Sequence, residues 1–188
     1  WLGTAGTRWG LDRDQDGEID QWKMISAEEA AEEVFNAVQN RDVRRYELLL
    51  PDSKELESME LGPVMNQVLT GNLKDLSAKF KQLSADQTQV DSKSKWVHFG
   101  SSRPSLVPRG QSGIEKDLVV YDHASAVFQT GEKYGQLSLG TIARIGDNWR
   151  ITELPQIVEE SSVVRNGGLF YPSESSSPLL TAAAEPTD

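Results

Sequence analysis

Cysteine is absent from the 188 residues, so the chain can form no disulfide, no thiolate metal site and no dithiol redox centre. Basic residues are in the minority, with 19 Lys and Arg against 29 Asp and Glu, and the formal net charge of −10 repels phosphate backbones and anionic lipid surfaces. No apolar run approaches the roughly 20 residues that a membrane span requires. The sequence therefore predicts no nucleic-acid partner and no membrane span.

Length and composition favour one globular, water-soluble domain with loose ends. A chain of 188 residues with 37% hydrophobic residues is long enough to bury one core and too short for two ordinary domains. The charged fraction of 26% is ordinary for a globular protein. We expect an N-terminal extension over residues 1–25, a folded domain over 26–158, and a Ser- and Ala-rich linker or flexible tail over 159–188.

The beginning of the chain bears on its origin. Residues 1–10 lack the basic start and the apolar centre of a secretory signal, which is expected of a cytosolic protein or of one whose signal has been removed. Because the chain starts at Trp1, we expect it to be part of a longer protein.

An acidic segment near the N-terminus carries the sharpest chemical signal. A calcium loop of the EF-hand type has oxygen ligands at positions 1, 3 and 5, a glycine at 6, a backbone carbonyl at 7 and a side chain at 9. Counted from the first aspartate, these positions are Asp12, Asp14, Asp16, Gly17, Glu18 and Asp20. Position 12 of such a loop is a bidentate Glu, whereas here it is Lys23. The match covers only the first half of the loop.

Two interpretations of this segment stay open. Crowded carboxylates repel one another, which favours a bound Ca²⁺. A solvated acidic turn, in which Asp side chains accept hydrogen bonds from the turn's own amides, needs no metal. The candidate metal ligands are Asp12, Asp14, Asp16, Glu18 and Asp20. If calcium binds, we expect the missing carboxylate from Glu28 or Glu29 and a weak, roughly millimolar affinity.

Helical spacing dominates the segment that follows. Ser26 and Glu29 form a capping box at the start of an amphipathic helix, whose apolar residues recur every three or four positions. Further helices are predicted over residues 43–50, 53–61 and 64–85.

The second half of the domain has the character of a β-sheet. Near-alternating β-branched and aromatic residues predict strands over 95–99, 118–130, 135–145 and 148–154, joined into an antiparallel meander by tight turns. One face of this sheet is predicted to carry Leu137, Leu139, Thr141, Ala143 and Ile145. Helices followed by strands predict an α+β fold, with N-terminal helices packed on a curved antiparallel sheet and preceded by the acidic EF-hand-like loop.

Two stretches resemble the NTF2-like superfamily of cone-shaped α+β domains, namely AEEAAEEVFNAVQNRD at 27–42 and GDNWRI at 146–151. The resemblance covers residues 26–154 and implies a cone that serves as a binding or accessory domain or as an isomerase or dehydratase. The segment DGEIDQWK at 16–23, which leads into ISAEE at 25–29, resembles the N-terminal region of bacterial extracytoplasmic thiol–disulfide oxidoreductase-like proteins, where it precedes a thioredoxin-like module.

These resemblances, together with the missing Cys-x-x-Cys, favour a non-catalytic accessory or binding domain of a larger extracytoplasmic protein, periplasmic or secreted. Its expected partner is another protein or a module of the parent chain, and its cone is a candidate site for a small apolar ligand. We assign no catalytic or cofactor-binding residue on this interpretation.

The alternative is an isomerase- or dehydratase-like enzyme with a proton-transferring group in the cone. Its candidate residues are His98, Tyr121, Asp122 and His123. As neighbours in one strand, Asp122 and His123 face opposite sides and cannot form a dyad.

Overall fold

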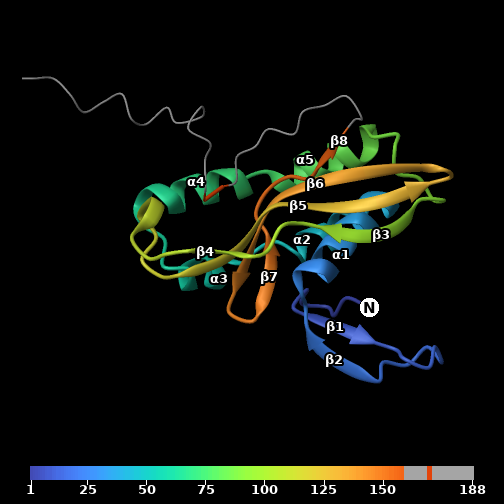
Figure 1. Ribbon diagram of the computed structural model, residues 1–188, viewed down its shortest axis with the longest axis horizontal. Helices are drawn as coiled ribbons and strands as arrows, with labels where there is room; N and C mark the ends of the chain where they lie inside the picture. Colours follow the sequence, from blue (N-terminus) through green and yellow to red (C-terminus); the bar gives the residue numbers. More distant parts are fainter. Residues whose placement is uncertain (159–168, 171–188) are drawn as a thin grey trace, which may run out of the picture.

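The computed structural model describes residues 1–158 and 169–170. In this part of the chain, five α-helices pack against a strongly curled, six-stranded antiparallel sheet, and a separate β-hairpin precedes them (Figure 1). The predicted α+β fold is confirmed. The tail expected over 159–188 lies outside the described residues, apart from Leu169 and Phe170.

The N-terminal hairpin consists of β1 (Arg8–Leu11) and β2 (Gln21–Met24), which pair antiparallel over four residues each. These two strands were not predicted from the sequence. Their residues are mostly exposed and lack the alternation of apolar and polar residues that marks a strand with one buried face.

The first helix, α1 (Ala27–Asn40), begins as predicted. The Glu29 N–H donates to Ser26 Oγ at 3.3 Å, and the Ser26 N–H donates back to the Glu29 carboxylate at 2.9 Å. The helix ends at Arg41, which adopts a left-handed conformation with φ of 54°. Because both ends are set by nearby residues, the local sequence is sufficient to predict them.

The remaining helices are α2 (Val43–Glu47), α3 (Ser53–Ser58), α4 (Pro63–Leu73) and α5 (Leu76–Asp86). The prediction of one helix over 64–85 is wrong, because the chain breaks between α4 and α5. Lys74 is extended and Asp75 is left-handed, with φ of 61°. Asp tolerates this conformation better than most residues do, and periodicity alone does not reveal it.

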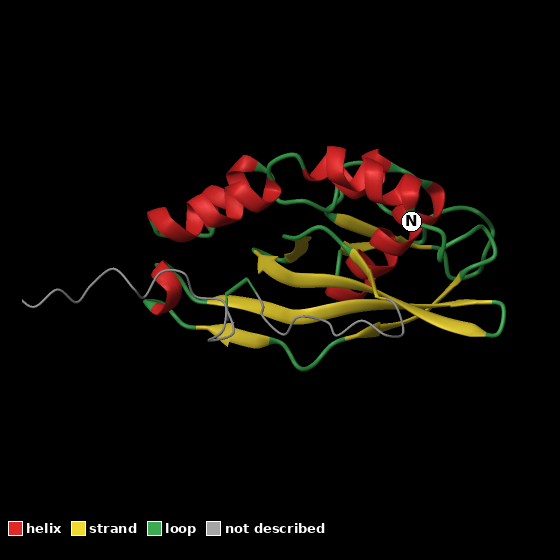
Figure 2. Ribbon diagram, turned by 90° about the horizontal axis from the view of Figure 1, so that it is seen from above, coloured by secondary structure: helices red, strands yellow, loops and turns green. Residues whose placement is uncertain are grey.

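The sheet has the order β3-β5-β6-β7, with β4 added beside β5 and β8 beside β6. Its strands are β3 (Lys95–Gly100), β4 (Ser105–Val107), β5 (Leu118–Thr130), β6 (Lys133–Ile145), β7 (Asn148–Ile151) and β8 (Gln156–Val158). Figure 2 shows the long β5–β6 pair curling as it crosses the molecule. The three-residue strands β4 and β8 were not predicted.

The β5–β6 pairing is irregular in the middle. Its register shifts between Tyr121 and Ala124, where His123 has φ of 55°, and Gly140 opposite has φ of 67°. Leu139 and Ile142 belong to one hydrophobic cluster, whereas Ala143 belongs to another. The prediction of one shared face from Leu137 to Ile145 is therefore wrong, because a bulge reverses which side chains face which side.

Two hydrophobic clusters result. The first cluster joins α1, α2 and α5 to the sheet, and its members include Phe35, Tyr46, Phe80, Phe128, Leu137, Leu139 and Ile142. The second cluster joins the α3–α4 region to β4, β5 and β6, and consists of Met59, Met65, Leu69, Val107, Ile114, Leu118, Val120, Ala143, Ile145 and Phe170.

A buried arginine connects the hairpin to the domain. Arg150 in β7 is 3% exposed. Its Nε lies 2.8 and 3.0 Å from the two carboxylate oxygens of Glu55, and its Nη1 donates to the carbonyls of Gly6 at 2.9 Å and Leu48 at 3.1 Å. A side chain at Gly6 would collide with the Leu48 carbonyl. The N-terminal segment, the α2–α3 region and β7 therefore meet at one guanidinium.

We expect Arg150→Met to lower the free energy of unfolding by about 3–5 kcal/mol. The substitution removes the guanidinium donor from two carbonyls and from the Glu55 carboxylate, which among the described residues keeps only the Asp52 N–H. Arg144→Met, which removes an exposed ion pair with Asp147 at 3.2 Å, is the control. It should cost less than about 1 kcal/mol. Urea unfolding followed by circular dichroism measures both values, and equal losses would contradict the anchoring role of Arg150.

Candidate metal centre

The acidic segment forms the turn between β1 and β2. The pairing of Leu11 with Gln21 closes its base, and the Asp20 N–H donates to the Leu11 carbonyl at 2.8 Å. Gln15 and Gly17 have positive φ angles of 62° and 95°, the left-handed region that tight turns use. The turn therefore folds back on itself and brings its side chains together.

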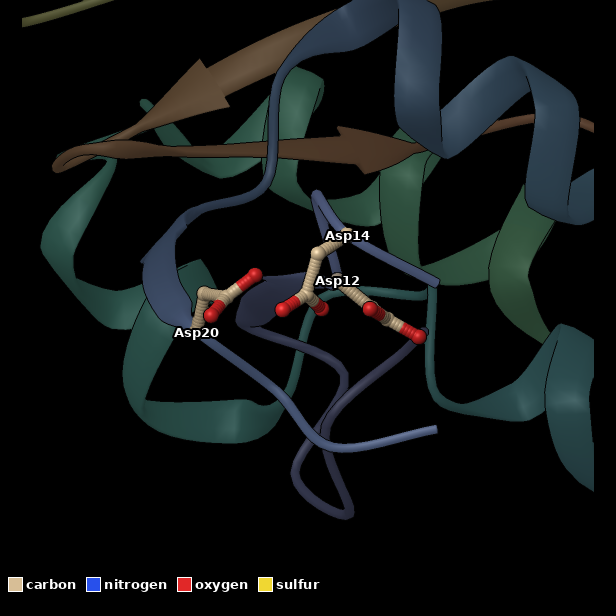
Figure 3. Close-up of side chains that lie close together, drawn as sticks. All are labelled: Asp12, Asp14 and Asp20. Atoms are coloured by element: carbon tan, nitrogen blue, oxygen red, sulfur yellow. The ribbon is translucent and has the colours of Figure 1, made fainter. Parts of the chain in front are cut away.

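Three carboxylates converge in this turn (Figure 3). Asp12, Asp14 and Asp20 each offer an oxygen, and these oxygens all lie within 4.8 Å of one another. Two oxygens bound to the same Ca²⁺ at 2.3–2.6 Å can be at most about 5 Å apart. The cluster could therefore hold a metal ion of this size. Asp12 is half-buried, whereas Asp14 and Asp20 are exposed.

Backbone amides satisfy only part of this carboxylate group. Asp12 Oδ2 accepts from the Gly17 N–H at 3.0 Å, and Asp20 Oδ2 accepts from the Arg13 N–H at 2.7 Å. Asp12 Oδ1 is shielded from solvent and has no hydrogen-bond partner among the described residues. The turn therefore has features of both interpretations, an amide-stabilised acidic turn and an oxygen cage.

The other two candidate ligands lie outside the three-carboxylate group. Asp16 Oδ1 accepts from the Glu18 N–H at 2.8 Å, in a turn of its own, and Glu18 is exposed. In the EF-hand pattern the residue at position 7 contributes its backbone carbonyl, so an outward Glu18 side chain is compatible with that pattern.

Glu29 is not available as the missing carboxylate. Its Oε1 lies 2.5 Å from Lys23 Nζ, and its Oε2 accepts from the backbone and hydroxyl of Ser26. Lys23 occupies position 12 of the loop pattern, where a Glu is missing. It is thus paired with one of the two carboxylates that were expected to take the place of that Glu. Glu28 is exposed in the first turn of α1.

The residues considered for catalysis lie in different surroundings. His98 and His123 are exposed, and Tyr121 packs edge-on against Phe99 with ring centres 5.2 Å apart. Asp122 is buried beside Thr141, whose Oγ1 donates to it at 3.4 Å. Burial raises the pKa of Asp122, and the nearby His123 and Thr141 oppose this shift.

A group of hydrogen-bonded polar residues around Thr141 was not predicted from the sequence. The Thr141 N–H donates to Glu153 Oε1 at 2.7 Å, and its carbonyl accepts from Thr152 Oγ1 at 2.6 Å. The bulge at Gly140 lets the Glu153 carboxylate lie close to the strand at Thr141. Any side chain at position 140 would collide with this carboxylate. The glycine within an otherwise regular strand pattern was the available signal.

Comparison with models of protein families, with curated proteins and with solved structures finds no match to this chain. The helices packed against a curled antiparallel half-barrel are consistent with an NTF2-like cone. Within residues 1–158, no helix combines the length and apolar character that crossing a bilayer requires.

We expect Asp122→Asn to stabilise the protein at neutral pH. Folding raises the pKa of the Asp122 carboxyl above its ordinary value of 3.8. The protein therefore loses stability as the pH rises from 3.8 through the raised pKa, because the folded state must then hold a buried charge. Asn stays neutral and still accepts from Thr141, so the variant should melt higher than the wild type at pH 7 and equally at pH 3. Thermal unfolding between pH 3 and 8 tests this, with the exposed Asp147→Asn as control. A variant that melts lower at pH 7 would contradict the prediction.

Proposed function

We propose that this chain is a non-catalytic accessory or binding domain of the NTF2-like kind, part of a larger extracytoplasmic protein, and that its N-terminal hairpin binds Ca²⁺. The observation that carries the metal proposal is the convergence of Asp12, Asp14 and Asp20. The buried, unpartnered oxygen of Asp12 supports it.

Electrostatics favours a cation in this turn. The three carboxylates carry like charges within a few ångströms, and the chain as a whole is acidic, with a net charge of −10. The Arg13 N–H occupies one oxygen of Asp20, and the Gly17 N–H occupies one oxygen of Asp12. The second oxygen of each carboxylate is left for a metal. A divalent cation would remove the repulsion that the amides leave uncompensated.

The ligand set suggests weak binding and therefore a compartment. The bidentate Glu of a high-affinity loop is replaced by Lys23, and two of the three gathered carboxylates are exposed. Such a site matches the roughly 10⁻⁴–10⁻³ M affinities of extracellular calcium modules. Cytosolic calcium is too dilute to fill it, which supports an extracytoplasmic location.

An accessory role is supported by the hairpin's surface. Trp1, Trp22 and Met24 are 57%, 43% and 43% exposed, so the metal-bearing element also presents large apolar side chains. Exposed groups of this kind are typical of contact surfaces when they lie together. A bound cation would rigidify the turn of the same hairpin, which suits contact with another protein or with a module of the parent chain.

The catalytic alternative has less support. The two histidines are exposed, and the hydrogen-bonding neighbour of the buried Asp122 is a threonine hydroxyl rather than a second ionisable side chain. Proton transfer in a pocket requires an acid or base within reach of the substrate.

Calcium titration followed by amide chemical shifts tests the metal site directly. We expect saturable shifts at Gly17 and Asp20 with a dissociation constant on the order of 1 mM. Asp12→Asn and Asp14→Asn should each abolish them, while Asp86→Asn, at the exposed end of α5, should leave them unchanged. Absence of saturable shifts would favour the solvated acidic turn.

Calcium should also reverse the effect of one substitution on stability. Without the metal, Asp14→Asn relieves repulsion, so it should raise the melting temperature or leave it unchanged. At a calcium concentration ten times the dissociation constant, the wild type should gain about 1.4 kcal/mol that the variant lacks. Differential scanning calorimetry with and without calcium measures this change, and a parallel response of both proteins would contradict it.

A further inference from the structure

We propose that the second cluster, together with Thr141, is a docking site for a short apolar peptide segment, and that Leu169–Phe170 of the same chain is the segment that occupies it. This site is separate from the acidic turn between β1 and β2. The inference therefore does not rest on calcium binding.

The apolar part of the site encloses an aromatic ring. Phe170 is fully buried, and it belongs to the same cluster as Met59, Met65 and Leu69 from the helical side and Val120 from β5. Methionine side chains are unbranched and adaptable, and they recur on surfaces that accept different apolar partners. Two methionines in the same cluster as the buried Phe170 give the site side chains that can adjust to such a group.

The polar part of the site recognises a peptide backbone. The Leu169 N–H donates to Thr141 Oγ1 at 3.0 Å, while the hydroxyl of Thr141 donates to Asp122 at 3.4 Å. The backbone of Thr141 is itself fixed, because its N–H is bound by Glu153. Its hydroxyl oxygen is thus oriented as an acceptor next to an apolar pocket. A hydrocarbon ligand would leave this acceptor unused, whereas a peptide satisfies it.

The walls of the site come from residues that precede the segment that fills it. Every other member of the second cluster lies between Met59 and Ile145. Leu169 and Phe170 belong to no helix or strand, and the backbone of Leu169 is held by a side chain rather than by the pairing of a sheet. The last strand, β8, pairs with β6 at Gln136–Ser138, away from Thr141. A segment seated in this way resembles a bound peptide more than an element of the fold.

The test uses the full chain and a labelled peptide, acetyl-GGLFYP-amide, which copies residues 167–172. In the wild type the tethered segment competes at a high effective concentration, so the peptide should bind weakly. Phe170→Ala should bind it at least tenfold more tightly, with no gain for the peptide GGLAYP. Val64→Ala, an exposed position on α4, should behave as the wild type does. A folded Phe170→Ala protein with no gain in affinity would overturn the proposal.

Hydrogen exchange of the wild type keeps the proposal testable if Phe170→Ala does not fold. A docked segment opens without global unfolding, so the Leu169 amide should exchange at least tenfold faster than the Ile142 amide in the centre of β6. Excess peptide should accelerate it further. Equal exchange rates at both amides would identify Phe170 as an ordinary core residue. A wild-type dimer that dissociates on replacing Phe170 would overturn the intrachain assignment in favour of a second copy.

Discussion

The buried guanidinium of Arg150 is the constraint on which the arrangement of the domain depends. A charge removed from water must have its donors satisfied, and here the acceptors come from α3, from the end of α2 and from the N-terminal segment. β7 therefore reaches its position only when these segments are also in place. Through the Gly6 carbonyl, the same contact fastens the N-terminal segment to the domain, and with it the hairpin that carries the acidic turn.

The irregularity in β5 and β6 is the second determinant. The register shift near His123 and the left-handed Gly140 reverse the faces of both strands, which divides the core into two clusters. Asp122 and Thr141 thereby become buried beside the second cluster rather than the first. The polar group that receives the Leu169 N–H is thus a product of the bulge, and bulges at such positions commonly redirect side chains toward a site.

The two proposed sites rest on different kinds of interaction. The acidic turn gathers charge at the surface of a small hairpin, where solvent limits how tightly a cation is held. The second cluster excludes water almost completely around Phe170 and offers one oriented acceptor at its edge. A weak cation site and an enclosed peptide site suit a domain that contacts other parts of a larger protein.

Features set by neighbouring residues followed from the sequence by itself. The capping box at Ser26, the hairpin turn at Gly146 and the spacing of aspartates in the acidic turn all depend on interactions a few residues apart. Other features were decided only by tertiary structure: the break at Asp75, the reversal at Gly140, the three-residue strands, the pairing of Lys23 with Glu29, and the burial of Phe170. Each of these depends on which distant segment a residue meets, and residue periodicity carries no information about that choice.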